Sequence, residues 1–462
     1  MKYKVWGKAA VALKPAKHHY TTISVVLFIL ALFVTFIVVI RMGMLYAGSI
    51  YSGIREPYIQ SLGSKNVVIR WQSDERVKGK VVLLKRSDDS EISFSETTAK
   101  ESHAVNLQGL DAGTRYYYRL YHDQHIFREG PDYWFETAPE SGASNPVRIW
   151  ILGNPGASPE KSQLVQKGML DWVKENPRSN HSILNMIIST GNNTHGNGSN
   201  NKYQQDLFSV QENLFKNFVF WPVYGEVDAK GWSFFNIFSL PENAEAGGLA
   251  SGTERYYSVD YGPLHLIFLD SDEGGYTPED AMLRWLKKDL KNTNQKWIIT
   301  FMHHPPYTRG SHNSNDARDS GNRMFNMRKR VLPILEEAGV DMVIAGHSYS
   351  YERSSLIDCH YGITSDFQQS TVIQKGPQFN KPAGKVPHQG TVYAVLGSSS
   401  MSMPGQFDHP AMVRSSMQPG SMILDIEDEK LAAYFINDKA KIVDQFEINK
   451  SQSVPVRKRQ CQ

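Results

Sequence analysis

Five apolar runs of the sequence each end at a short polar motif, and the motifs hold side chains of the types that bind metal ions or transfer protons. The motifs are Gly153-Asn154-Pro155-Gly156, Gly191-Asn192-Asn193-Thr194-His195, Gly225-Glu226-Val227-Asp228, His303-His304-Pro305-Pro306-Tyr307 and Gly346-His347-Ser348-Tyr349. In open α/β sheets, ligands bind outside the carboxyl ends of the strands. If the apolar runs are strands of such a fold, the five motifs converge, and we expect them to form one site.

The elements that must position these motifs change character along the chain. Over residues 147–448, short apolar runs alternate with helical stretches that begin at Ser158-Pro159 and Thr277-Pro278, and this alternation is typical of an α/β fold. Residues 57–138 instead hold β-branched and aromatic runs between turn residues, which predicts an all-β sandwich without chemistry of its own. The stretch 139–146 is typical of a linker.

A membrane anchor is expected before both regions. Residues 21–40 contain no charged side chain, and the segment 21–45 is long enough to cross a bilayer as one helix. A secretory signal is the alternative, but its apolar part usually runs about 7–15 residues, so we expect an uncleaved anchor. Residues 1–20 hold five lysines and no acid, which predicts a cytoplasmic or matrix N-terminus and places residues 42–462 across the membrane.

Charge and cysteine content exclude two classes of protein. The chain has a formal net charge of +3, and the five lysines of residues 1–20 exceed it. Residues 21–462 therefore carry a small net negative charge, which gives no support for nucleic-acid binding. Cys359 and Cys461 allow at most one disulfide, which excludes a disulfide-stapled scaffold and leaves their pairing open. Residues 449–462 are interpreted as a basic, solvated tail.

Residues 57–448 resemble a known family. Besides the five motifs, the resemblance rests on residues 238–271, FMHHPPYTRGSH (301–312), GHSYSYERSSLIDCHYG (346–362) and GTVYAVLGSS (390–399). The segments are similar to the purple acid phosphatases, a branch of the calcineurin-like metallophosphoesterases. The resemblance implies that the single membrane helix is followed by a fibronectin-III-like sandwich over residues 57–138 and an α/β metallophosphoesterase sandwich over residues 147–448.

In that family two metal ions sit at the strand ends, bound by the motifs GDxG, GDxxY, GNH, VxxH and GHxH. The ions lower the pKa of a bridging water and clamp the phosphoryl oxygens for in-line attack. This sequence departs from the pattern at Asn154, Asn192, His195, Glu226, Val227 and Tyr349, whereas His303 and His347 keep the family's histidines. Because amides do not offset cation charge and Val227 cannot donate a proton, neither a dinuclear centre nor conventional phosphatase activity is expected.

The metal content of the cleft is left open between two alternatives. His303, His347, Glu226 and the side-chain carbonyl of Asn192 could hold one divalent Zn, Fe or Mn ion. The second site, formed by Asn154, His195 and Tyr349, is then degenerate. The other alternative is a metal-free cleft held by hydrogen bonds.

The remaining polar residues near the motifs are given lesser roles. His304 falls at a non-ligand position of the family pattern, and His312 is a weak candidate for a catalytic, substrate-facing histidine. The others are interpreted as capping, turn or loop-holding residues, with a Glu–Arg pair among them: Asp228, Asp270, Asp272, Tyr351, Glu352 and Arg353.

The sequence therefore predicts a membrane-anchored, non-catalytic pseudophosphatase that serves as an accessory or interaction subunit, in contact with other proteins of a membrane assembly. One alternative is an active metallophosphoesterase with a mononuclear or atypical metal site. The other is a module that binds phosphate ligands without hydrolysing them.

Overall fold

The computed structural model describes residues 19–85, 90–178, 182–275, 277, 279–459 and 461, and the chain divides into two units, Met1–Ala47 and Gly48–Gln462. Helix α1 (His19–Gly48) contains a span, Val25–Gly43, with a mean hydropathy of 2.9 and exposed side chains. Its 19 residues extend about 28 Å as an α-helix, close to the ~30 Å of a hydrocarbon core. The helix predicted over residues 21–45 is confirmed, whereas its membrane topology stays a prediction. The basic tail 1–20 lies outside the described residues, except for its last two.

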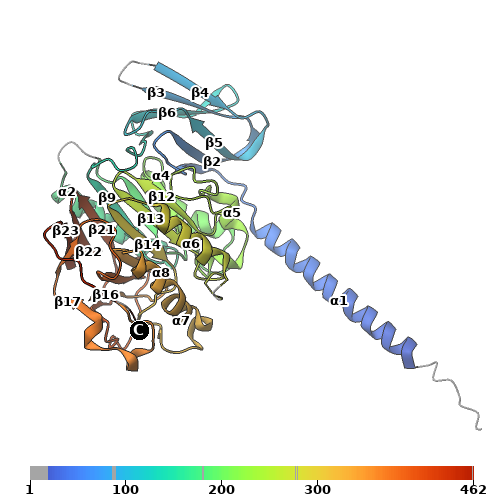
Figure 1. The fold of residues 1–462 in the computed structure, drawn as a ribbon. Helices are drawn as coiled ribbons and strands as arrows, with labels where there is room; N and C mark the ends of the chain where they lie inside the picture. Colours follow the sequence, from blue (N-terminus) through green and yellow to red (C-terminus); the bar gives the residue numbers. More distant parts are fainter. Residues whose placement is uncertain are drawn as a thin grey trace, which may run out of the picture. The chain divides into compact units, whose positions relative to one another are not determined.

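Two antiparallel sheets open the second unit, and they confirm the all-β character predicted for residues 57–138 (Figure 1). One sheet has the strand order β1-β2-β5, and the other has the order β4-β3-β6-β7 with β8 beside β6. Their strands are β1 (Arg55–Gln60), β2 (Asn66–Val77), β3 (Gly79–Lys85), β4 (Ser90–Ser95), β5 (Lys100–Gln108), β6 (Arg115–His122), β7 (His125–Arg128) and β8 (Trp134–Glu136). The fibronectin-type identity of this part stays a prediction.

The β-sandwich is joined to the α/β part by buried polar contacts. The Tyr58 hydroxyl donates to the Ile237 carbonyl (2.5 Å), and the Arg70 guanidinium donates to the Phe238 carbonyl (2.5 Å). The Tyr118 hydroxyl donates to the carbonyl of Lys216 (2.7 Å). Residues 48–462 accordingly form one compact unit, and the domain boundaries drawn from sequence stay predictions.

A seven-stranded mixed sheet provides the first layer of the α/β part, with the order β11-β10-β9-β21-β22-β23-β18. Strands β9, β10 and β11 run parallel, so their carboxyl ends lie at one edge. The strands are β9 (Val147–Leu152), β10 (Met186–Ser189), β11 (Val219–Pro222), β18 (Gln378–Pro382), β21 (Gly420–Glu427), β22 (Lys430–Asn437) and β23 (Ile442–Ser451).

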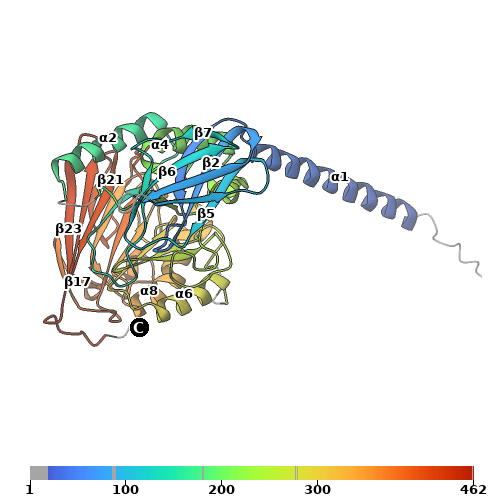
Figure 2. The ribbon, with the colours of Figure 1, turned by 90° about the horizontal axis from the view of Figure 1, so that it is seen from above.

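A second mixed sheet stacks on the first (Figure 2). Its order is β12-β13-β14-β15-β19-β16-β17, with β20 beside β16, and β13, β14, β15 and β19 run parallel. The ring of Tyr351 stacks on that of Phe435 across the two sheets, with centroids 4.1 Å apart. The strands are β12 (Tyr257–Tyr261), β13 (Leu264–Leu269), β14 (Trp297–Met302), β15 (Met342–Ala345), β16 (Tyr351–Ile357), β17 (Val372–Gln374), β19 (Thr391–Leu396) and β20 (Met412–Ser416).

Helices cover the outer faces of both sheets. Trp172 of α2 packs on Tyr434 of β22, while Leu286 of α6 and Leu335 of α8 join the apolar layer beneath the second sheet. The helices are α2 (Pro159–Glu175), α3 (Asn200–Tyr203), α4 (Ser209–Phe215), α5 (Ser233–Ile237), α6 (Ala281–Asn292), α7 (Arg323–Asn326) and α8 (Leu332–Glu337). Short helical turns are η1 (Gln204–Phe208), η2 (Asp228–Lys230), η3 (Asp319–Asn322), η4 (Met327–Val331), η5 (Thr364–Asp366) and η6 (Gln369–Thr371).

The two helix starts read from sequence have different outcomes. Helix α2 begins at Pro159 with Ser158 as its cap, as predicted. Helix α6 begins at Ala281, not near Thr277, because the Asp280 carboxylate caps it by accepting from the N–H groups of Met282 (2.9 Å) and Leu283 (3.4 Å). The predicted role of Pro278 lies outside the described residues.

The C-terminal segment is more ordered than a solvated tail. Strand β23 runs to Ser451, and the buried Lys450 ammonium contacts the Asp341 carboxylate (2.7 Å), so the first residues of the expected tail 449–462 belong to the sheet. Cys359 and Cys461 form a disulfide, which settles the pairing that the sequence left open.

The fold buries a charged histidine beneath α6. Burial alone would lower the pKa of His265, but its ring hydrogen-bonds Asp260 (2.7 Å) and Asp289 (2.8 Å), and these two carboxylates raise the pKa to about 9. A raised folded-state pKa stabilises the protein below the unfolded-state value of about 6.5. The stabilisation is lost as the pH rises through 9.

We predict that the free energy of unfolding of the full chain falls between pH 6.5 and pH 9.5, and that His265 contributes about 3 kcal/mol of this fall. Urea unfolding measures this change. Because Glu336 and Glu254 also have raised pKa values of about 8 and about 7, the variant His265→Gln should reduce the fall by about 3 kcal/mol without removing it. The exposed control His125→Gln should keep the full fall. The same pH dependence in His265→Gln and the unmodified chain would contradict the assignment.

Candidate functional site

The carboxyl ends of parallel strands from the two sheets meet, as the sequence predicted. The Thr190 hydroxyl, after β10, donates to the carbonyl of Leu396, the last residue of β19 (3.0 Å). The N–H of Gly153, after β9, donates to the Ser399 hydroxyl (2.8 Å). A Cβ at Gly153 would lie 1.7 Å from the Leu396 carbonyl oxygen, so the sheets approach this closely only with glycine there.

Three buried histidines form the centre of the site. The rings of His303 and His347 have centroids 5.1 Å apart, and the ring of His304 lies 4.9 Å from the first and 4.5 Å from the second. One nitrogen from each ring lies within 4.8 Å of the other two. His304, which sequence reasoning placed at a non-ligand position, is therefore part of the cluster.

Each ring is oriented by a hydrogen bond at one nitrogen. The Nδ1–H of His303 donates to the Thr190 carbonyl (2.8 Å), so its Nε2 carries a lone pair. The Nε2 of His347 contacts the Ser320 hydroxyl (2.5 Å), and the Nδ1 of His304 contacts the Ser271 hydroxyl (2.9 Å).

The second nitrogen of each ring is buried without a hydrogen-bond partner among the described residues. These atoms are Nε2 of His303, Nε2 of His304 and Nδ1 of His347. A buried polar atom without a partner costs roughly 1–3 kcal/mol, so three of them in one place indicate a site suited to a ligand.

Burial keeps the three imidazoles neutral. Desolvation lowers the pKa of His303 to about 4 and lowers the pKa values of His304 and His347 well below the usual range. The neighbouring rings and Arg323 lower these pKa values further. Neutral imidazoles are the protonation state that binds metal ions.

Glu226 places a carboxylate at the edge of the cluster. Its Oε1 lies 3.8 Å from Nδ1 of His347, and its side chain is 39% exposed. The loop that carries Glu226 is held by the Oδ1 of Asn192, which accepts from the Val227 N–H (2.9 Å). Glu226 thus lies beside His347, and Asn192 lies at the base of the Glu226 loop; the single metal site of these residues with His303 stays a prediction.

The Asn154 carboxamide joins loops through hydrogen bonds at both its oxygen and its nitrogen. Its Oδ1 accepts from the N–H of His347 (3.1 Å). Its Nδ2 donates to the carbonyl of His347 (3.1 Å) and to the carbonyl of Gly397 (3.3 Å). Asn154 lies 1% exposed and connects the loop after β9 to the loops after β15 and β19.

The other two members of the predicted second metal site lie apart from this arrangement. His195 is exposed and belongs to none of the His, Cys, Asp and Glu clusters of the described residues; its backbone N–H donates to Asp206 (3.0 Å). Tyr349 is half-buried, and burial followed by the charge of Glu226 raises the pKa of its hydroxyl. The degenerate second metal site of Asn154, His195 and Tyr349 stays a prediction.

His312 supports the cluster from one side. Its ring stacks on that of His347 with centroids 3.9 Å apart, and its Nδ1 contacts the Asp319 carboxylate (2.9 Å). The Ser320 hydroxyl bridges Asp319 (2.7 Å) and His347. A substrate-facing role for His312 stays a prediction.

Of three aspartates near the motifs, Asp228 and Asp270 have the turn and capping roles expected of them, whereas Asp272 forms an ion pair. Asp228 accepts from the N–H groups of Gly225 (3.0 Å) and Asn193 (3.2 Å), and burial raises its pKa to about 6. Asp270 accepts from two backbone N–H groups of the turn that follows β13, and Asp272 pairs with Arg323 (2.9 Å).

The expected pairing of Glu352 with Arg353 is wrong. Arg353 pairs with Asp444 of β23 (2.6 Å), whereas Glu352 accepts from the N–H groups of Arg309 (3.2 Å) and Gly310 (3.1 Å). Because adjacent residues of a strand point to opposite faces, the two side chains meet different neighbours. Both still hold loops, as predicted for their role.

Sequence reasoning missed Ser320 of η3 and Arg323, the first residue of α7, which approach the cluster. Ser320 and Asn322 have φ values of 54° and 68°, and this left-handed turn brings the Ser320 hydroxyl to His347. The adjacency of His304 to His303 was the signal available for the third ring. No residue pattern marked Ser320.

Comparison with known proteins agrees with this geometry. Residues 130–351 match the family model of the calcineurin-like phosphoesterases. Purple acid phosphatase 1 of Ipomoea batatas is 25% identical over 309 residues, which cover 63% of this chain and 59% of that protein. Fe(3+)-Zn(2+) purple acid phosphatase 12 of Arabidopsis thaliana is 23% identical over 279 residues, which cover 57% and 54%. The match spans just over half the length of these relatives.

A solved structure shows the same fold. The purple acid phosphatase PPD1 from yellow lupin (Lupinus luteus) seeds superposes with a TM-score of 0.65 at 15% identity, over 87% of this chain and 77% of that chain. The likeness extends beyond the segment that the family model covers. The converging strand ends, the family match over residues 130–351 and the sequence relatives show a calcineurin-like phosphoesterase domain that is similar to the purple acid phosphatases.

Proposed function

We propose that this protein is a membrane-anchored pseudophosphatase, a phosphoesterase fold that no longer hydrolyses esters with two metals and that serves as an accessory or interaction subunit. Its N-terminus lies in the cytoplasm or matrix, and residues 48–462 lie across the membrane. The observation that carries the proposal is the hydrogen bonding of the Asn154 carboxamide, which uses both of its ends on the backbone.

An aspartate would not fit at position 154. Its second oxygen would face the carbonyl oxygens of His347 and Gly397, which now accept from the Asn154 amide. Removing a donor from buried acceptors costs roughly 1–3 kcal/mol, and a charge placed against them costs more. The loops are therefore arranged around an amide, where a two-metal centre needs a carboxylate ligand.

The remaining donors do not fit a pair of ions either. A two-metal centre supplies an activated water and a clamp for the phosphoryl oxygens, and it needs carboxylates to offset its charge. Asn154 and Asn192 are neutral, and His195 is exposed outside the cluster. Val227 stands where the family has a histidine, and general acid help is typically worth about 10²–10⁴ in rate.

A single transition ion is the second candidate ligand, and the three unpartnered imidazole nitrogens favour it. Nε2 of His303, Nδ1 of His347 and Nε2 of His304 would supply nitrogen donors, and Glu226 would supply one negative charge. Imidazole and carboxylate donors suit Zn, Fe or Mn. One ion held in this way would stabilise the loops without restoring two-metal hydrolysis.

We predict that the purified full chain holds at most one transition-metal ion and hydrolyses an aryl phosphate at the background rate. Metal analysis and a phosphatase assay across acid and neutral pH measure these properties. His303→Ala or His347→Ala should abolish ion binding, and the exposed control His195→Ala should leave it unchanged. Two ions per chain, with turnover abolished by His303→Ala, would overturn the proposal.

We predict that Asn154→Asp lowers the free energy of unfolding by more than about 3 kcal/mol, because it removes two donated hydrogen bonds and places a charge against two carbonyl oxygens. Thermal and urea unfolding measure the loss, and the exposed Asn197→Asp is the matched control. If Asn154→Asp together with Asn192→Asp instead bound a second ion and gained stability from it, the cleft would be arranged for a dinuclear centre.

A further inference from the structure

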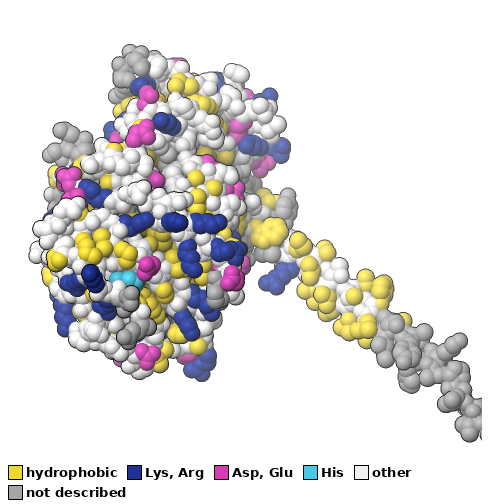
Figure 3. Space-filling view, in the orientation of Figure 1, with side chains coloured by type: hydrophobic (Ala, Val, Ile, Leu, Met, Phe, Trp, Pro, Cys, Tyr) yellow, Lys and Arg dark blue, Asp and Glu magenta, His cyan; other side chains and the backbone are white. Residues whose placement is uncertain are grey.

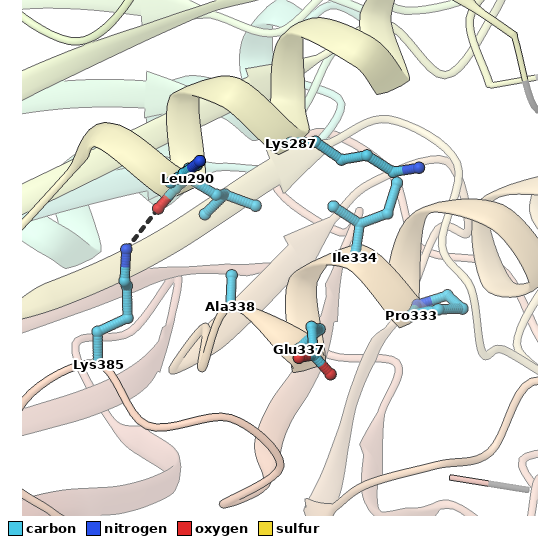
Figure 4. Close-up of a pocket in the computed structure, with 8 residues that line it drawn as sticks. Lys287, Leu290, Pro333, Ile334, Glu337, Ala338 and Lys385 are labelled. Atoms are coloured by element: carbon cyan, nitrogen blue, oxygen red, sulfur yellow. Dashed lines mark hydrogen bonds between the residues drawn. The ribbon is translucent and has the colours of Figure 1, made fainter. Parts of the chain in front are cut away.

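Helices α6 and α8 leave an apolar groove between them, away from the strand-end cleft. Its floor consists of Leu290 of α6 with Pro333, Ile334 and Ala338 at and after α8, and its volume is about 500 Å³ (Figure 4). Clefts of roughly 300–1,000 Å³ with apolar linings are the size that accommodates a bound ligand.

Lysines form the rim of this groove. Lys287 and Lys291 lie one turn apart on the exposed face of α6, and neither has an ion-pair partner among the described residues. Lys385 closes the end of α6 by donating to the Leu290 (2.6 Å) and Thr293 (3.0 Å) carbonyls. The acid on the rim, Glu337, is already paired with His388 (2.9 Å).

The same face carries further positive charge. Arg284 is exposed on α6 one turn before Lys287, and Lys329 is exposed one turn before Pro333. The acid of α6, Asp289, is buried against His265 and does not offset these charges. Figure 3 shows Lys and Arg side chains gathered over this part of the surface.

We propose that this groove is the docking site for an acidic amphipathic helix of a partner protein. The apolar residues of such a helix, at positions i, i+3 or i+4, and i+7, would fill the groove, and its Asp and Glu residues would meet Lys287 and Lys291. The inference rests on the proposed interaction role and names the chemistry of the partner for that role.

The shape of the surface favours a helix over a membrane. A protein face that binds a bilayer presents protruding apolar side chains to the lipid. Here the apolar residues lie recessed in a groove, and the charged side chains lie around them. Exposed charges of one sign raise the association rate constant and make it depend on the salt concentration. The buried apolar contact supplies most of the affinity.

The test measures binding of a labelled helical peptide to the full chain in nanodiscs of zwitterionic lipid. The probe has 18 residues with Leu at i, i+3, i+4 and i+7 spacing and Glu elsewhere. Two control peptides are used: a scrambled one, which has no apolar face, and one with Lys in place of Glu. We expect fluorescence anisotropy to show the acidic amphipathic probe binding at least tenfold more tightly than either control.

Variants locate the site. Lys287→Glu with Lys291→Glu should weaken binding of the probe at least tenfold, and Ala338→Trp, which fills the groove, should do the same. Lys288→Glu, on the same helix but outside the groove lining, is the matched control and should change the affinity less than twofold. Unchanged thermal unfolding of the lysine variants would show that the fold is kept.

Three outcomes would overturn the inference: equal binding of the scrambled peptide, equal weakening by Lys288→Glu, or groove-dependent binding of oleate or phosphatidylserine vesicles without peptide binding. If one of these outcomes is found and metal analysis shows no pair of ions in the strand-end cleft, the docking site is rejected and the proposed loss of hydrolysis is unaffected. A two-metal, active cleft would reject the proposed function and leave the peptide result unaffected.

Discussion

The carboxamide of Asn154 holds together the region on which the rest of the site depends. It ties the loop after β9, in the first sheet, to loops after β15 and β19 in the second, and the second sheet carries His303 and His347. In a two-metal enzyme, cations draw carboxylates of both sheets together. Here neutral hydrogen bonds from one carboxamide join loops of the two sheets. These contacts are the basis for the proposed loss of the two-metal centre.

The three imidazoles give the cleft a definite chemical character. They are neutral, buried and oriented by Thr190, Ser320 and Ser271, so each presents a nitrogen toward the others. Hydrogen bonds to the other ring nitrogen fix the tautomer and orientation of a ligand histidine. The three rings are therefore ordered as ligand histidines are. The proposed loss of two-metal hydrolysis concerns the neutral residues around them, Asn154 and Asn192.

Sequence reasoning recovered the parts of the structure that follow from local pattern. The long N-terminal helix followed from an uncharged apolar run, α2 from its Ser158 cap, and the convergence of the motifs from the rule for strand ends. It did not recover contacts that depend on tertiary approach. Ser320 reaches His347 through a left-handed turn, and Arg353 finds Asp444 some 90 residues along the chain. Spacing in the sequence carries no signal for either contact.

The bridge between Cys359 and Cys461 has a consequence for where the protein resides. The two cysteines are 102 residues apart, and a crosslink over about 100 residues restricts an unfolded chain enough to matter for stability. Glutathione and thioredoxin keep cytosolic thiols reduced, whereas bridges persist in secretory and other oxidising spaces. The Cys359–Cys461 disulfide therefore agrees with the orientation expected from the N-terminal lysines, in which residues 42–462 lie across the membrane from the N-terminus.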